Sequence, residues 1–162
     1  MFQVLLVCTG NTCRSPMAAG LLKSILPPEI AGNVRVVSAG TGALPGSPPS
    51  ELAVSTLASS GIDIREHRSV TLSADLLRES DLILGMEPQH LERTRELAPD
   101  AAARAYLITE QGAGGRRHSG DGIADPMGAG ADTYQDTFHR IRSHLIRWVP
   151  VIRDEVERRE RV

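Results

Sequence analysis

The feature that most restricts the fold of this chain is an apolar, β-favouring run that stops abruptly at Cys8 and gives way to a short polar loop. The run Phe2–Val7 predicts a buried strand, ended by a glycine-bearing loop. Ser15 and Pro16 then favour the start of a helix, because serine is a good N-cap and proline suits the first helical position. The chain therefore opens with a predicted strand, a tight loop and a helix.

Strand and helix patterns continue to alternate along the chain, which predicts an α/β fold with a parallel sheet. We expect a single-domain three-layer sandwich, an open four-stranded parallel sheet with helices on both faces. In such sheets, ligands bind at the carboxyl ends of strands, where the strand order switches. The expected helices cover Pro16–Leu26, Ser50–Ser60, Ser69–Ser80 (capped by Ser69 or Thr71) and Pro88–Leu97. The further expected strands cover Val34–Val37, Asp81–Met86 and Arg104–Ile108. The segment Thr109–Asp132 is irregular and glycine-rich.

The last part of the chain predicts a long amphipathic helix, which Pro150 kinks or shortens. Its sequence end, RDEVERRERV, predicts a solvated helix terminus or a frayed tail. The apolar residues at alternating steps of four and three are Tyr134, Phe138, Ile141, Leu145, Trp148 and Ile152.

Composition limits the classes of function. The chain has 162 residues, of which 41% are hydrophobic, enough for one domain spanning 1–162. A formal net charge of -2 argues against a general nucleic-acid or membrane-surface binder. Both cysteines lie in the opening loop, which fits a reducing compartment, and the start of the chain shows no leader. We therefore expect a soluble, cytoplasmic protein, and the five histidines lack metal-ligand spacing.

The opening loop has the features of an oxyanion site. Backbone N–H groups of a short curled loop, together with a helix N-terminus, favour a bound anion. Arg14 adds a planar fork that can grip two phosphate oxygens. The same field stabilises a thiolate, so we expect Cys8 to have a lowered pKa and to act as a nucleophile, with Ser15 donating to the sulfur.

The segment VCTGNTCRSP closely resembles the signature of low-molecular-weight protein tyrosine phosphatases. The resemblance continues through SAG at Ser38–Gly40, LILGM before a helix, and Asp125-Pro126. It implies a cysteine-dependent phosphatase that forms a phosphocysteine at Cys8, uses Arg14 and needs no cofactor. It also implies that Asn11, Ser15, Ser38 and His67 form a hydrogen-bonded network, and that phosphate is bound by Thr9, Gly10, Asn11, Thr12, Cys13, Arg14 and Ser15.

A second catalytic group is needed, because the leaving group of phosphoryl transfer must receive a proton. Asp125 stands out because Pro126 restricts its backbone, and because a long irregular loop in a compact domain is usually functional. The family's general acid lies in such an Asp-Pro pair. The other carboxylates near this loop are Asp121, Asp132 and Asp136.

The side chain of Cys13 has two possible roles. A reversible disulfide with Cys8 would protect an oxidised nucleophile from deeper oxidation. Alternatively, Cys13 simply packs beneath the loop.

The sequence leaves two substrates open, phosphotyrosine and phosphoarginine in proteins. With Thr12 in its loop, the chain resembles the bacterial protein arginine phosphatases. The chain has few aromatic residues to hold a phenyl ring, although Leu44 and Met127 can pack on one. An arsenate reductase would need further cysteines after Cys13, and a phosphate-binding module without turnover would need neither nucleophile nor acid. We expect no nucleic-acid or membrane partner, and a monomer in preference to a weak dimer.

Overall fold

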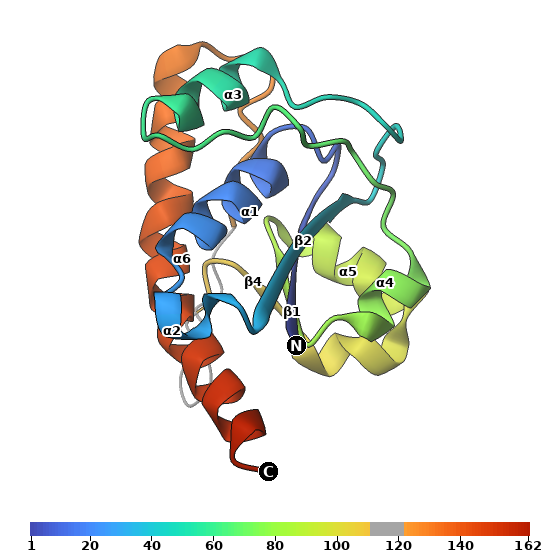
Figure 1. Ribbon diagram of the computed structural model, residues 1–162. Coiled ribbons are helices and arrows are strands. Elements are labelled where there is room, and N and C mark those ends of the chain that lie inside the picture. Colours follow the sequence, from blue (N-terminus) through green and yellow to red (C-terminus); the bar gives the residue numbers. More distant parts are fainter. Residues whose placement is uncertain (111–121) are drawn as a thin grey trace.

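The computed structural model describes residues 1–110 and 122–162. At its centre, four strands form a parallel sheet in the order β2-β1-β3-β4 (Figure 1). This confirms the expected open, four-stranded α/β sheet with helices packed around it. The strands are β1 (Phe2–Cys8), β2 (Val34–Gly40), β3 (Leu82–Gly85) and β4 (Ala105–Leu107).

The residues of β1 alternate between two hydrophobic clusters, one on each face of the sheet. Leu6 and Cys8 belong to the larger cluster, which includes residues of α1, α3 and α6. Leu5 and Val7 belong to the smaller cluster, which includes residues of α4 and the 3₁₀ helix η1. Figure 1 shows α1, α3 and α6 on one side of the sheet and α4 and α5 on the other. The helices are α1 (Arg14–Ile25), α2 (Pro28–Ala31), α3 (Glu51–Ala58), α4 (Ala74–Glu79), α5 (Pro88–Leu97), η1 (Pro99–Arg104) and α6 (Ala131–Glu160).

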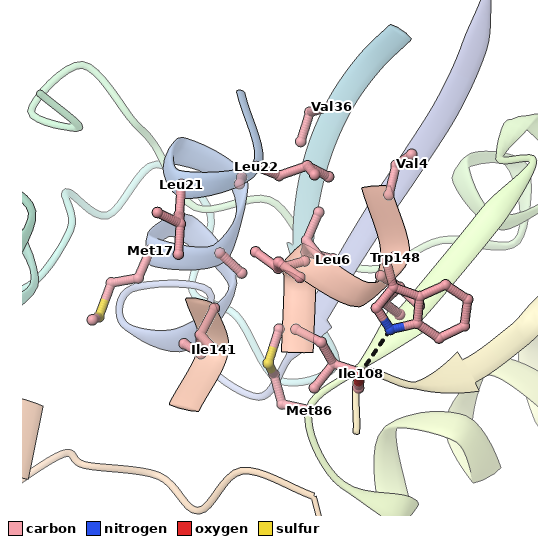
Figure 2. Packing of buried hydrophobic residues seen from close by; sticks show 14 of the residues in the cluster. Val4, Leu6, Met17, Leu21, Leu22, Val36, Met86, Ile108, Ile141 and Trp148 are labelled. Carbon is pink, nitrogen blue, oxygen red and sulfur yellow. Dashed lines mark hydrogen bonds between the residues drawn. The ribbon is translucent and has the colours of Figure 1, made fainter. Parts of the chain in front are cut away.

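The helix α6 buries the predicted apolar face, with Trp148 at 1% exposure. The Trp148 indole Nε1 donates to the Ile108 carbonyl at 2.8 Å, which fastens α6 to the residue after β4 (Figure 2). Pro150 does not shorten the helix, which continues to Glu160. The buried side chains of Trp148 and Ile152 hold the helix against the sheet on both sides of the proline.

Two expected helix starts are wrong. The helix α1 begins at Arg14, with Cys13 at the N-cap, because the Ser15 hydroxyl bonds the Cys8 sulfur and does not cap the helix. The helix α4 begins after Ser73, whose hydroxyl accepts from the Leu76 N–H at 3.2 Å. Ser69, the expected cap, instead accepts from the Ser47 N–H at 2.8 Å in an earlier loop.

The other expected elements are present, but α3, β3 and β4 are each shorter than expected by one or more residues at both ends. The helix α5 covers Pro88–Leu97 as expected. The strand β2 extends beyond Val37 to Gly40, where it pairs with Cys8 of β1, so that Ser38 lies inside the strand. Within the described ranges, none of the helices has the length and apolar character to cross a bilayer.

Candidate active site

The loop between β1 and α1, here called the cysteine loop (residues 8–15), lies at the carboxyl end of an inner strand. Because β2 flanks β1 on one side and β3 on the other, the strand order switches at this point. A crevice at such a switch point is where open α/β sheets bind ligands. The fold therefore places the cysteine loop where a binding site is expected.

Cys8 lies at the base of this loop and is 1% exposed. Its Sγ is 2.8 Å from the Ser15 Oγ and accepts the Asn11 backbone N–H at 3.2 Å. Burial raises the pKa of the Cys8 thiol, against the lowering effects of Ser15, the Arg14 charge and the Asn11 N–H. Burial thus opposes the expected lowering of this pKa, because the folded loop removes water from the sulfur.

Asn11 holds the shape of the loop from inside. It is fully buried and has a φ of 55°, in the left-handed region that asparagine tolerates. Its Nδ2 donates to the Ser15 Oγ at 2.7 Å and the Ser38 Oγ at 3.0 Å, and its Oδ1 accepts from the Val70 N–H at 2.8 Å. The His67 Nε2 donates to the backbone carbonyl of Asn11 at 2.7 Å. The structure thus brings together the four network residues.

Arg14 is 2% exposed, and its charge faces two carboxylates. The Nη1 donates to the Ile123 carbonyl at 2.8 Å and to Glu87, with which it forms an ion pair. The Nη2 lies 3.7 Å from the Asp125 Oδ2. Sequence reasoning missed Glu87, although an acidic residue shortly after a strand end was a signal that could have found it.

Asp125 is the only one of the four candidate acids within ion-pair distance of Arg14 among residues 1–110 and 122–162. Its Oδ1 accepts from the Met127 N–H at 3.0 Å, which sets the direction of the carboxylate. Its loop is fixed to the end of β3, since the Ile123 N–H donates to the Met86 carbonyl at 2.7 Å. Asp132 and Asp136 lie on α6, and Asp121 falls outside the described residues.

Cys13 is buried beneath the loop at 3% exposure. Its Sγ lies 3.1 Å from the Tyr134 hydroxyl of α6 and 3.3 Å from the Ser50 hydroxyl, the N-cap of α3. Thr12 and Gly10, its neighbours in the loop, are half-buried. The remaining residue of the loop, the exposed Thr9, bonds through its Oγ1 to the His90 Nε2 at 2.9 Å.

Comparison with known proteins gives one consistent result. The family model for low molecular weight phosphotyrosine protein phosphatases matches residues 3–160. The chain is 37% identical over 150 residues to the probable low molecular weight protein-tyrosine-phosphatase EpsP of Ralstonia nicotianae, covering 93% of this chain and 95% of that relative.

Two solved structures extend the comparison. The YwlE arginine phosphatase from Geobacillus stearothermophilus has a TM-score of 0.84 and 33% identity, covering 96% of this chain and 95% of that one. A YwlE arginine phosphatase mutant with a phosphorylated active-site serine has a TM-score of 0.83 and 33% identity, covering 94% and 96%.

The contacts of Cys8 predict the effect of Ser15→Ala on the thiol. Removing the hydroxyl removes a hydrogen bond that lowers the pKa of Cys8, while burial continues to raise it. We expect the midpoint of the rate of alkylation by iodoacetamide, followed against pH, to move upward from the wild-type value. The control is Ser24→Ala, an exposed serine on the same helix that bonds the Leu21 carbonyl. An unchanged or lower midpoint in Ser15→Ala would contradict this account of the thiol.

Proposed function

The chain belongs to the low molecular weight phosphotyrosine protein phosphatase family and is a cysteine-dependent protein phosphatase, and we propose that it acts through a phosphocysteine at Cys8. The observation that carries the proposal is the 3.7 Å approach of the Asp125 carboxylate to the buried Arg14 of the cysteine loop. The phosphorylated active-site serine of the YwlE mutant supports a covalent intermediate.

In the first step, the Cys8 thiolate attacks phosphorus and the bond from phosphorus to the leaving group breaks. The bonding electron pair goes to the leaving atom, which takes a proton from the Asp125 carboxyl. Arg14 and the loop N–H groups stabilise the charge on the equatorial oxygens. Because burial opposes thiolate formation, the Ser15 hydroxyl and the Asn11 N–H have to stabilise the sulfur anion.

In the second step, water attacks the phosphocysteine. The Asp125 carboxylate takes a proton from that water, the bond between sulfur and phosphorus breaks, and the thiolate leaves with the electron pair. The contacts of the sulfur with Ser15 and Asn11 then stabilise the leaving thiolate. Both steps use the same groups, with Asp125 first as acid and then as base.

Phosphorylated proteins are the substrates that the family implies. We propose that one copy of the chain, acting as a single catalytic domain over 1–162, forms a complete site, since Cys8, Arg14 and Asp125 belong to the same chain. The net charge of -2 supports a protein substrate in preference to nucleic acid.

The acid role of Asp125 predicts a dependence on the leaving group. Asp125→Asn should lower kcat/KM by about 10²–10⁴-fold on phenyl phosphate, the range for general acid catalysis, and by much less on p-nitrophenyl phosphate, whose leaving group needs no proton. Steady-state rates on a series of aryl phosphates measure this, with Cys8→Ser as the inactive blank. Asp132→Asn, an exposed acid on α6, is the matched control. Equal losses across the series would remove Asp125 from the acid role.

For the substrate, phosphotyrosine is our first candidate and phosphoarginine the second. EpsP is named a tyrosine phosphatase, and the apolar Leu44 and Met127, 77% and 57% exposed, offer surfaces for a phenyl ring. Phosphoarginine is supported by the YwlE arginine phosphatases and by the polar Thr12. The carboxylate of Glu87 also adds negative charge near Arg14, which favours a cationic guanidinium.

Thr12→Ile tests which substrate the loop selects. If the Thr12 hydroxyl favours phosphoarginine, the replacement should raise the ratio of kcat/KM for phosphotyrosine to that for phosphoarginine peptides by about tenfold, the scale of one polar contact with substrate. Thr71→Ile, an exposed threonine outside the cysteine loop, is the control. A ratio that stays constant would exclude Thr12 as the determinant.

For redox control, we propose that Cys13 protects Cys8. Hydrogen peroxide oxidises the Cys8 thiolate to a sulfenic acid and is itself reduced to water; the Cys13 thiol then displaces that hydroxyl as water and forms a disulfide. Dithiothreitol should restore most activity after peroxide treatment of wild type and much less in Cys13→Ser, whose Cys8 oxidises further. Ser50→Ala removes one contact of the Cys13 sulfur and keeps both thiols, so it serves as control. Equal recovery in Cys13→Ser and wild type would overturn the proposal.

A further inference from the structure

His90 is a fully buried histidine that the proposed mechanism does not use. It lies in the first turn of α5, and both of its ring nitrogens are hydrogen-bonded. The Glu87 backbone N–H donates to Nδ1 at 2.9 Å, and Nε2 lies 2.9 Å from the Thr9 Oγ1. Because a backbone N–H can only donate, Nδ1 has to carry a lone pair. The proton of the neutral ring therefore lies on Nε2, which donates to Thr9.

The two partners of His90 lead to different parts of the site. Thr9 follows the nucleophile in the cysteine loop, and its carbonyl accepts from the Gly42 N–H at 3.0 Å. Glu87 is the N-cap of α5, and its carboxylate pairs with Arg14. One imidazole thus connects the cysteine loop to the residue that holds the arginine.

The contacts of Arg14 show what this connection can control. A guanidinium Nη1 carries two hydrogens, and in Arg14 they point to Glu87 and to the Ile123 carbonyl. With Nη1 held in this way, the edge formed by Nε and Nη2 is the one that can grip two phosphate oxygens. A shift of Glu87 would rotate that edge.

We propose that His90 is a positioning residue of the phosphatase reaction, a neutral imidazole that fixes Thr9 and Glu87 relative to each other and thereby aims the Nε–Nη2 edge of Arg14 at the phosphate. This inference rests on the proposed role of Arg14. It assigns His90 no proton transfer, since both ring nitrogens are engaged with the protein.

The electrostatic surroundings keep the ring neutral. Burial and the charge of Arg14 from α1 lower the pKa of His90 to about 4, against the raising effects of Glu87 and of Asp125. At neutral and mildly acidic pH, Nδ1 therefore remains an acceptor for Glu87. Protonation would set an N–H at Nδ1 against the Glu87 N–H and break this bond.

The test compares His90→Asn with His90→Gln. The Asn side chain can accept from the Glu87 N–H but is too short to reach Thr9, whereas the Gln amide is long enough to donate to Thr9. We expect His90→Asn to lower kcat/KM on p-nitrophenyl phosphate by about tenfold, the effect of one lost buried hydrogen bond, and to weaken inhibition by vanadate by a similar factor. His90→Gln should recover part of both.

Thr94→Val is the matched control, because Thr94 is equally buried on α5 and its hydroxyl donates to the His90 carbonyl at 3.0 Å. It should lower the Tm and leave both kinetic readouts unchanged. Thr9→Val removes the same bond from the loop side, at an exposed residue, and should match His90→Asn. The double variant should lose no more than either single one.

If His90→Asn and Thr9→Val lower only the Tm and leave kcat/KM and vanadate inhibition at the wild-type values, His90 is an ordinary core histidine and the inference is wrong. If His90→Asn does not fold, Thr9→Val decides. Arg14→Lys separates the two proposals: full activity in that variant overturns the role of Arg14 itself, whereas an inactive Arg14→Lys with unaffected His90→Asn and Thr9→Val overturns only the role of His90.

Discussion

The site depends on one unfavourable turn of the backbone, the left-handed conformation of Asn11. For a residue other than glycine this conformation costs about 1–2 kcal/mol. The hydrogen bonds that Asn11 donates to Ser15 and Ser38, and those it accepts from Val70 and His67, offset that cost, each contributing about 1 kcal/mol. Because this turn directs the Asn11 N–H toward the Cys8 sulfur, the network determines the chemistry of the nucleophile as well as the shape of the loop.

The same compactness creates an electrostatic conflict. Burying the Cys8 thiol disfavours its anion, and burying Arg14 requires a negative partner. Glu87 and Asp125 supply that partner, so the arginine is held in place before any phosphate arrives. A dianionic phosphate adds negative charge next to Arg14, Glu87 and Asp125. Arg14 can still bind the phosphate, because one edge of its guanidinium does not face Glu87. Glu87 thus occupies Nη1, while the Asp125 carboxylate lies 3.7 Å from Nη2 on the edge that we assign to phosphate.

Sequence patterns were sufficient for the architecture, because the apolar runs, the proline-started helix α5 and the apolar stripe of α6 are local signals. They were insufficient wherever a side chain has a distant partner. The contact of Ser15 with the Cys8 sulfur agrees with the expectation, but its expected role as the helix cap is wrong. Glu87 and His90 read as ordinary residues of a helix start, since their contacts with Arg14 and Thr9 arise only when β3 pairs beside β1. The burial of Cys8, which raises the pKa of its thiol, also could not be read from spacing.

The strand order explains why groups from distant parts of the chain meet. The cysteine loop follows β1, Glu87 and His90 follow β3, and the loop of Asp125 is anchored to the residue after β3 through Met86. The remaining contact comes from α6, whose Tyr134 hydroxyl reaches the Cys13 sulfur under the loop. The buried stripe of α6 begins at this tyrosine and continues to the Trp148 contact with Ile108 beyond β4. The final helix therefore joins the cysteine loop and the end of β4 to one core, so loss of its packing would disturb both.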